Sequence, residues 1–133
     1  MVYLSNRSFK MWAYTVSHCS LLLRSELKYF DEEAYSDSMS YNIDIEFWAV
    51  QYIDIPSSFR GIRIREVINN DIRKAIIART SLENGKVFEI ETKDKKYYVI
   101  AGGVLVGKNK WENQDRIFNY DQNLEHEEVI TTA

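Results

Sequence analysis

The sequence predicts a mainly β fold, a single antiparallel sheet of about six or seven strands coiled into a barrel or a sandwich, with one helix near residues 70–82. Two observations lead to this prediction. From Tyr41 to Glu46 apolar and polar residues alternate, which is typical of a strand with one buried face. From Phe47 to Ile53 both faces become largely apolar, as in a strand that is covered on both sides.

The stretch from 41 to 55 is too long to run straight through a single domain. Its residues at about 3.3 Å each span roughly 50 Å, whereas a compact chain of this length has a diameter of roughly 36 Å. We therefore expect a bend or bulge near Trp48–Val50, before Pro56, the only proline, ends the strand. A straight strand that projects as a dimerisation ribbon is the alternative.

The segments before this strand are less regular. Residues 1–8 are interpreted as an arm. Phe9–Arg24 is aromatic and β-branched and then leucine-rich, which predicts one long strand or two strands that meet near Ser17–His18. Ser25–Ser40 is polar and acidic and is predicted to be a loop, with a helical turn around Asp31–Tyr35.

The segment from Ile62 to Val67 alternates again and is predicted to form a hairpin with the end of the preceding strand. One register keeps both faces consistent, because a slip by one residue would bury two arginines among apolar side chains. That register pairs Ile53 with Ile64, Ile55 with Ile62, Asp54 with Arg63, and Tyr52 with Arg65.

The next segment favours a helix. Asn69–Asp71 offers an N-cap, and apolar residues recur at helical spacing from Ile68 to Leu82. Asn84–Gly85 would end the helix, although the same dipeptide is also a favoured hairpin turn, which leaves a strand as the alternative.

The C-terminal third begins with a predicted hairpin around Asp94–Lys95. Its expected register sets Phe88, Ile90 and Thr92 opposite Ala101, Val99 and Tyr97. Gly102–Gly103 is expected to turn the chain into a strand at 104–106, and residues 119–133 are expected to form a flexible tail.

Composition indicates one domain over residues 1–133, with 45% hydrophobic residues and a net charge of −3. No apolar run is long enough for a membrane helix. With one cysteine and no secretory leader, we expect a cytoplasmic protein. The segment 60–79 holds six basic and two acidic residues. It could bind nucleic acid, but pairing of its arginines with acidic side chains on neighbouring strands is the favoured interpretation.

No motif predicts chemistry. His18 and Cys19 are adjacent and would point to opposite faces of a strand, so they are badly placed to form a nucleophile pair. Asp44 and Glu46 share a strand face at a spacing that suits acid–base work or a hard cation, but such pairs are common on solvated sheets. We therefore predict no catalytic residue, no metal and no cofactor, and an enzymatic role is not expected.

The functional hypothesis is an interaction module. Under the hairpin register above, Trp48, Tyr52, Arg63 and Arg65 share one face, and such aromatic–arginine surfaces suit protein partners. We predict a protein partner or a homodimer through these four residues. The alternatives are a small molecule inside a β-barrel, with Asp44 and Glu46 as the acid–base pair, and nucleic acid bound through 60–79.

Overall fold

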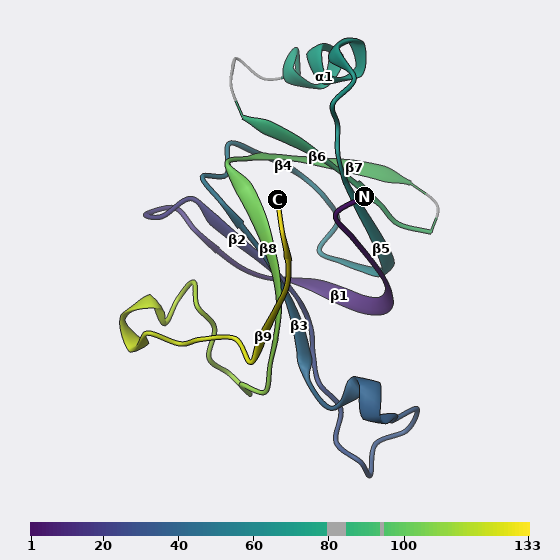
Figure 1. Cartoon of the computed structure of the whole chain (residues 1–133), viewed down its shortest axis with the longest axis vertical. Helices are drawn as coiled ribbons and strands as arrows, with labels where there is room; N and C mark the ends of the chain where they lie inside the picture. Colours follow the sequence, from purple (N-terminus) through teal and green to yellow (C-terminus); the bar gives the residue numbers. More distant parts are fainter. Residues whose placement is uncertain (80–84, 94) are drawn as a thin grey trace.

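Within the residues that the computed structural model describes, 1–79, 85–93 and 95–133, nine strands form one antiparallel sheet (Figure 1). The strand order is β4-β7-β6-β5-β1-β2-β3-β8-β9. The strands are β1 (Tyr3–Thr15), β2 (Ser20–Ser25), β3 (Asn42–Trp48), β4 (Tyr52–Asp54), β5 (Ser58–Glu66), β6 (Lys86–Glu91), β7 (Lys96–Ala101), β8 (Gly103–Asn109) and β9 (Glu128–Thr132). The predicted fold class is confirmed, although the strand count was too low and the sheet does not close into a barrel.

The sheet is strongly coiled. Phe47 of β3 and Phe88 of β6 lie four strands apart in the sheet order, which in a flat sheet would separate them by about 19 Å. Their ring centroids are 5.7 Å apart, so the two halves of the sheet face each other across one core. The buried core residues come from seven strands and from the link after β3: Phe9, Leu21, Leu23, Ile43, Ile45, Phe47, Val50, Ile62, Ile64, Phe88, Ile90, Val99, Ala101, Val104 and Val106.

The long strand predicted at 41–55 is broken where the pattern changes. β3 ends at Trp48, and Ala49 adopts a positive φ of 50°. The amide of Val50 then donates to the Cys19 carbonyl, and that of Gln51 donates to Ile100. The chain thus leaves the neighbours of β3 and continues as β4 beside β7. The expected bend at Trp48–Val50 is confirmed, and the straight ribbon is not formed.

The predicted hairpin between β4 and β5 is wrong. β4 pairs with β7, whereas β5 lies between β1 and β6. In this arrangement Arg63 lies opposite Glu91, and Arg65 lies opposite Glu89. Both arginines thus gain a carboxylate across the strand, where the predicted register gave one of them only an aromatic ring.

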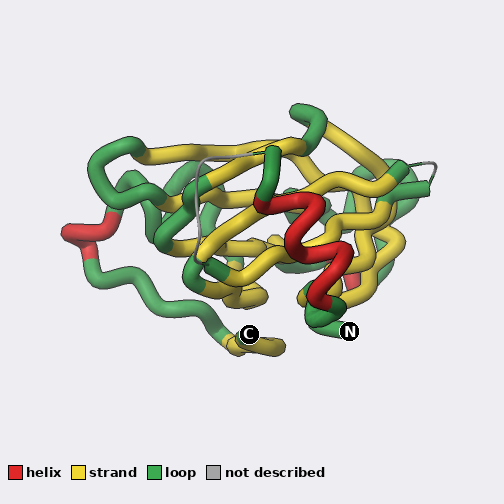
Figure 2. The backbone as a smooth tube through the Cα atoms, turned by 90° about the horizontal axis from the view of Figure 1, so that it is seen from above, coloured by secondary structure: helices red, strands yellow, loops and turns green. Residues whose placement is uncertain are grey.

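The predicted helix is confirmed as α1 (Asn70–Ile77). The Asn69 side chain caps it by accepting from the amides of Asp71 and Ile72. On the outer face of the sheet, Ile76 of the helix packs against apolar side chains of β6 and β7, and Figure 2 shows α1 lying across the strands from outside. The helix end expected at Asn84–Gly85 lies partly outside the described residues. Leu82, expected to contribute to the apolar face of the helix, lies wholly outside them.

The N-terminal half differs from the prediction in two places. The expected arm at 1–8 is a strand from Tyr3 onward, because it pairs with β5. The helical turn expected at Asp31–Tyr35 is wrong: these residues form no helix, and a short 3-10 helix, η1 (Asp37–Met39), follows them. The predicted alternative of two strands meeting near Ser17–His18 is confirmed by the turn between β1 and β2.

In the C-terminal third, the β6–β7 hairpin forms with a register shifted by two residues, so that Phe88 lies opposite Val99 and Ile90 opposite Tyr97. The shift keeps each side chain on its predicted face. Residues 119–133 include η2 (Tyr120–Gln122) and β9, which pairs with β8. Their mobility in solution stays a prediction.

Candidate functional site

The hairpin predicted to place Trp48, Tyr52, Arg63 and Arg65 on one face does not form between the described strands β4 and β5. Trp48 ends β3 and is 43% exposed, and its indole lies across Gly103. Tyr52 is half-buried against the cluster under α1. Arg63 forms an ion pair with Glu91 at 3.7 Å, and Arg65 lies opposite Glu89. The aromatic and arginine side chains therefore lie on different strands with separate neighbours.

The other sequence candidates, Asp44 and Glu46, lie on the outer face of β3 in a buried ionic network. Arg24 of β2 lies directly opposite Asp44. Its Nε donates to one carboxylate oxygen at 2.6 Å, and its Nη2 donates to the other at 2.8 Å. The same Nη2 also donates to the Gln114 carbonyl, and the guanidinium lies over the Trp12 ring. This buried arginine was not predicted from the sequence.

The network continues to His126, which lies in the segment predicted from the sequence to be a flexible tail. Asn109 donates to Asp44 at 2.9 Å and faces His126 Nδ1 at 3.2 Å, while His126 Nε2 lies 2.7 Å from a Glu46 oxygen. The imidazole is fully buried. Gly107 makes room for it, because a Cβ there would lie 2.5 Å from the His126 Cγ. A glycine inside a strand is a signal of such close approach.

Asp44, Glu46 and His126 offer ligand atoms that lie within 4.8 Å of one another. Their donor set does not fit a cation well. Both oxygens of Asp44 already accept hydrogen bonds from Arg24 and Asn109, and Arg116 lies 3.6 Å from Glu46. Two arginines thus balance the two carboxylates. The arrangement fixes the segment after β8 onto the sheet, and none of the three groups lines a described pocket.

An open groove forms where β1 and β2 separate. β1 pairs with β5 from Tyr3 to Lys10, but β2 pairs with it only from Lys10 onward. In the described structure, the second edge of β1 therefore has no strand beside it before Lys10. The groove has a volume of about 930 Å³ and is lined by Asn6, Arg7, Ser8, Phe9, Lys10, Arg24, Ser25, Glu26, Lys28, Ala34, Ser38, Met39, Ser58, Phe59 and Arg60.

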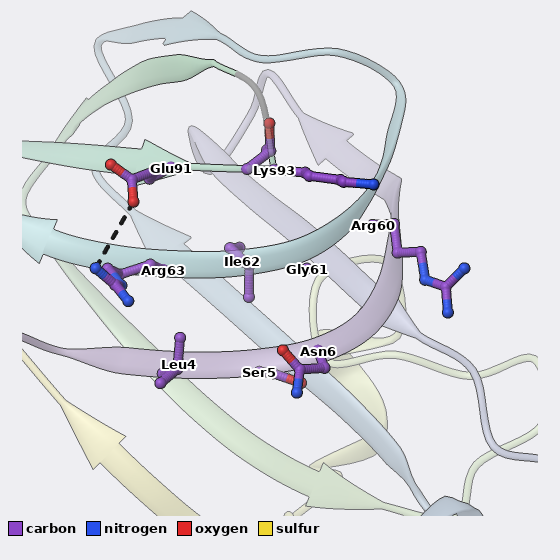
Figure 3. Close-up of a pocket in the computed structure, with 10 residues that line it drawn as sticks. Leu4, Ser5, Asn6, Arg60, Gly61, Ile62, Arg63, Glu91 and Lys93 are labelled. Atoms are coloured by element: carbon purple, nitrogen blue, oxygen red, sulfur yellow. Dashed lines mark ion pairs between the residues drawn. The ribbon is translucent and has the colours of Figure 1, made fainter.

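A second hollow continues the groove over the outer face of β1, β5 and the end of β6. It shares Asn6 and Arg60 with the first, and its volume is about 700 Å³. Its other lining residues are Leu4, Ser5, Gly61, Ile62, Arg63, Glu91, Thr92 and Lys93. Figure 3 shows Arg60 and Lys93 extending beyond one end of this hollow, while the Arg63–Glu91 pair lies toward the other. We call the two hollows together the basic groove.

Arg7 reaches across part of the gap from β1 to the end of β2 and to Tyr41. Its guanidinium donates to the carbonyls of Ser25, Glu26 and Tyr41 and lies over the Tyr41 ring. Desolvation by burial lowers the pKa of Arg7, although an arginine keeps its charge in proteins. Its Nη1 is buried without a hydrogen-bond partner among the described residues. Arg7 thus adds a fixed positive charge to the floor of the groove.

The lining of the basic groove is strongly cationic on a chain whose net charge is −3. Among the described residues, and setting aside Arg24, which Asp44 neutralises, six lysines and arginines line it against two glutamates, an excess of four positive charges. The glutamates pair with Lys10 and Arg63. The cations without a carboxylate partner among the described residues are Arg7, Lys28, Arg60 and Lys93.

The basic segment 60–79 is partly neutralised by ion pairs among the described residues. Arg63 pairs with Glu91, and Arg79 lies 3.9 Å from Asp54 and over the Tyr98 ring. Arg73 donates to the Gly85 carbonyl. The cross-strand pairing of an arginine with an acidic side chain, favoured from the sequence, is confirmed for Arg63. Most of the positive charge that lines the basic groove comes from residues outside 60–79.

Comparisons with known proteins add no identification, because no family model, no curated protein and no solved structure matches the chain. No helix among the described residues has the length and apolar character needed to span a bilayer.

Proposed function

We propose that the protein is a non-catalytic binding module that holds an extended, acidic segment of a partner protein in the basic groove. The observation that carries the proposal is the excess of four positive charges along a groove of an acidic chain. Carboxylates of a partner would form charge-assisted hydrogen bonds with Arg60, Lys28 and Lys93, and the positive lining would steer an acidic segment into the groove.

The backbone of β1 supports an extended ligand. Before Lys10, its second edge has no strand beside it in the described structure, and peptides commonly bind by adding a strand to such an edge. Side chains of an added strand would alternate, so every second residue would face the cations of the groove. The serine hydroxyls of Ser8, Ser38 and Ser58 add hydrogen-bonding groups along the same path.

Nucleic acid fits these observations less well. Single-stranded nucleic acid is usually held by aromatic rings that stack on bases, but the two aromatic residues of the groove, Phe9 and Phe59, stack on each other with centroids 6.1 Å apart, and Phe9 is buried. The net negative charge of the chain also opposes a long polyanion. A short acidic segment avoids that repulsion because its charges stay within the groove.

The test is fluorescence anisotropy with a labelled peptide of alternating glutamate and serine, compared with the same peptide carrying glutamine. We expect only the acidic peptide to bind, with an affinity that falls as salt rises. Arg60→Glu with Lys93→Glu should weaken binding by about tenfold or more. Lys74→Glu, an exposed charge reversal on α1, is the matched control and should leave the affinity unchanged.

Three outcomes would contradict the proposal. Equal binding of the glutamine and the glutamate peptides would show that the charge of the peptide does not contribute to binding. An unchanged affinity of the groove variant would move the site elsewhere. Tighter binding of a single-stranded oligonucleotide, lost in the same Arg60→Glu/Lys93→Glu variant, would assign the groove to nucleic acid.

A further inference from the structure

We propose that β9 is a self-association edge, at which two copies of the chain pair antiparallel around Ile130 and join their sheets. β9 is one of the two ends of the nine-stranded sheet and, in the part of the chain that the structure describes, pairs with β8 alone. Its outer edge therefore presents backbone donors and acceptors that a further strand can bind. Figure 1 shows β9 running along β8 at the margin of the sheet.

The side chains of β9 favour pairing. Four of its five residues, Val129 to Thr132, are β-branched, which suits a strand. Val129 is 49% exposed and Ile130 is 40% exposed. Edges are usually protected by charged side chains, proline or a bulge. β9 has no proline, but it has one charged residue, Glu128 at its first position, and a bulge at Ile130, which has no register partner in β8.

The single charged residue of β9, Glu128, favours one direction of pairing. In an antiparallel pair centred on Ile130, Glu128 of each copy lies opposite Thr132, and Val129 lies opposite Thr131. A parallel pair would instead set Glu128 against Glu128, which is unfavourable. The segment is thus complementary to itself in one direction, and a two-fold axis through Ile130 gives a closed dimer with no free edge at β9.

The opposite end of the sheet is less suited to such pairing. β4 has three residues, all half-buried, and Pro56 follows two residues after its end. Very short edge strands and proline both discourage further pairing. A dimer through β9 therefore stops at two copies, because β4 does not extend the sheet.

Disulfide trapping tests the pairing directly. Ile130→Cys is made in a Cys19→Ser background, so that the only thiol lies on the proposed axis. Directly opposed residues have Cβ atoms about 4.5–5.5 Å apart, close to the spacing that a disulfide needs. Under mild oxidation we expect covalent dimers, and Ile68→Cys in the same background, at an 81% exposed position outside the sheet, should stay monomeric. Equal cross-linking at both positions would overturn the proposal.

Sedimentation of the unmodified chain gives the second measurement. We expect the average mass to rise from monomer toward dimer with concentration, with a Kd on the order of tens of micromolar for so short an edge. Ile130→Lys should abolish the rise, because it places two cations opposite each other at the axis, while circular dichroism stays unchanged. A wild-type chain that remains monomeric at several hundred micromolar, or an Ile130→Lys variant that dimerises as well as wild type, would refute the proposal.

Discussion

Arg24 binds both carboxylate oxygens of Asp44, at 2.6 and 2.8 Å, in the buried network between β2 and β3. Neither side chain reaches solvent appreciably. Removal of one partner leaves an uncompensated buried charge, whereas replacement of both by apolar residues removes the desolvation cost together with the attraction. The pair is therefore a place where single and double substitutions should behave very differently.

We expect Asp44→Ala to lower the free energy of unfolding by about 3–5 kcal/mol, because Arg24 stays buried without its carboxylate. The double variant Arg24→Met/Asp44→Leu should be more stable than Asp44→Ala alone. Urea denaturation followed by fluorescence measures both quantities. Destabilisations that simply add would show that the two charges are not coupled in the folded protein.

The contact between Gly107 and His126 gives a second prediction. A Cβ at residue 107 would lie 2.5 Å from the imidazole, so Gly107→Ala should displace the histidine from Glu46 and destabilise the protein by about 1–3 kcal/mol. In a His126→Ala background, the same alanine meets no ring, and its effect should largely vanish. If Gly107→Ala has equal effects in both backgrounds, the close approach of the two residues is not the cause.

A third prediction separates the basic groove from the surface expected from the sequence. Trp48→Ala and Tyr52→Ala change side chains that do not line the groove, so neither should weaken binding of the acidic peptide. Lys28→Glu lies in the groove and should weaken it several-fold. Anisotropy titrations with matched salt measure all three affinities. Loss of binding in Trp48→Ala, with the fold intact, would support the binding surface predicted from the sequence and would count against the basic groove.

The sequence contained the elements of the fold, but pairing between distant strands was harder to infer. The change of pattern at Trp48–Val50 located the break, because a strand covered on both sides differs locally from one that is half-solvated. β5 pairs with β1 and β6 and not with the strand that precedes it in sequence, so a local hairpin pattern does not reveal its partners. Arg63 and Arg65 share the spacing of Glu89 and Glu91, and on antiparallel strands this match was a usable signal for the register that forms.

The candidate sites were recognised only in part for a related reason. Asp44 and Glu46 could be placed on one strand face from their spacing, but the burial of Arg24 and His126 depends on the segment after β8 that covers them. The basic groove depends on β2 leaving β1 at Lys10, which no local pattern encodes. Its cations come from segments far apart in sequence. A count of charge along the chain therefore does not show that these cations lie together in the folded protein.

NMR amide spectra of the labelled protein test most directly the proposal that an acidic segment binds along β1 in the basic groove. On titration with the glutamate–serine peptide, we predict the largest shifts at Asn6, Ser8 and Arg60, with little change in α1 or at His126. The largest shifts at α1 or around Trp48, or shifts of equal size with the glutamine peptide, would contradict the proposal.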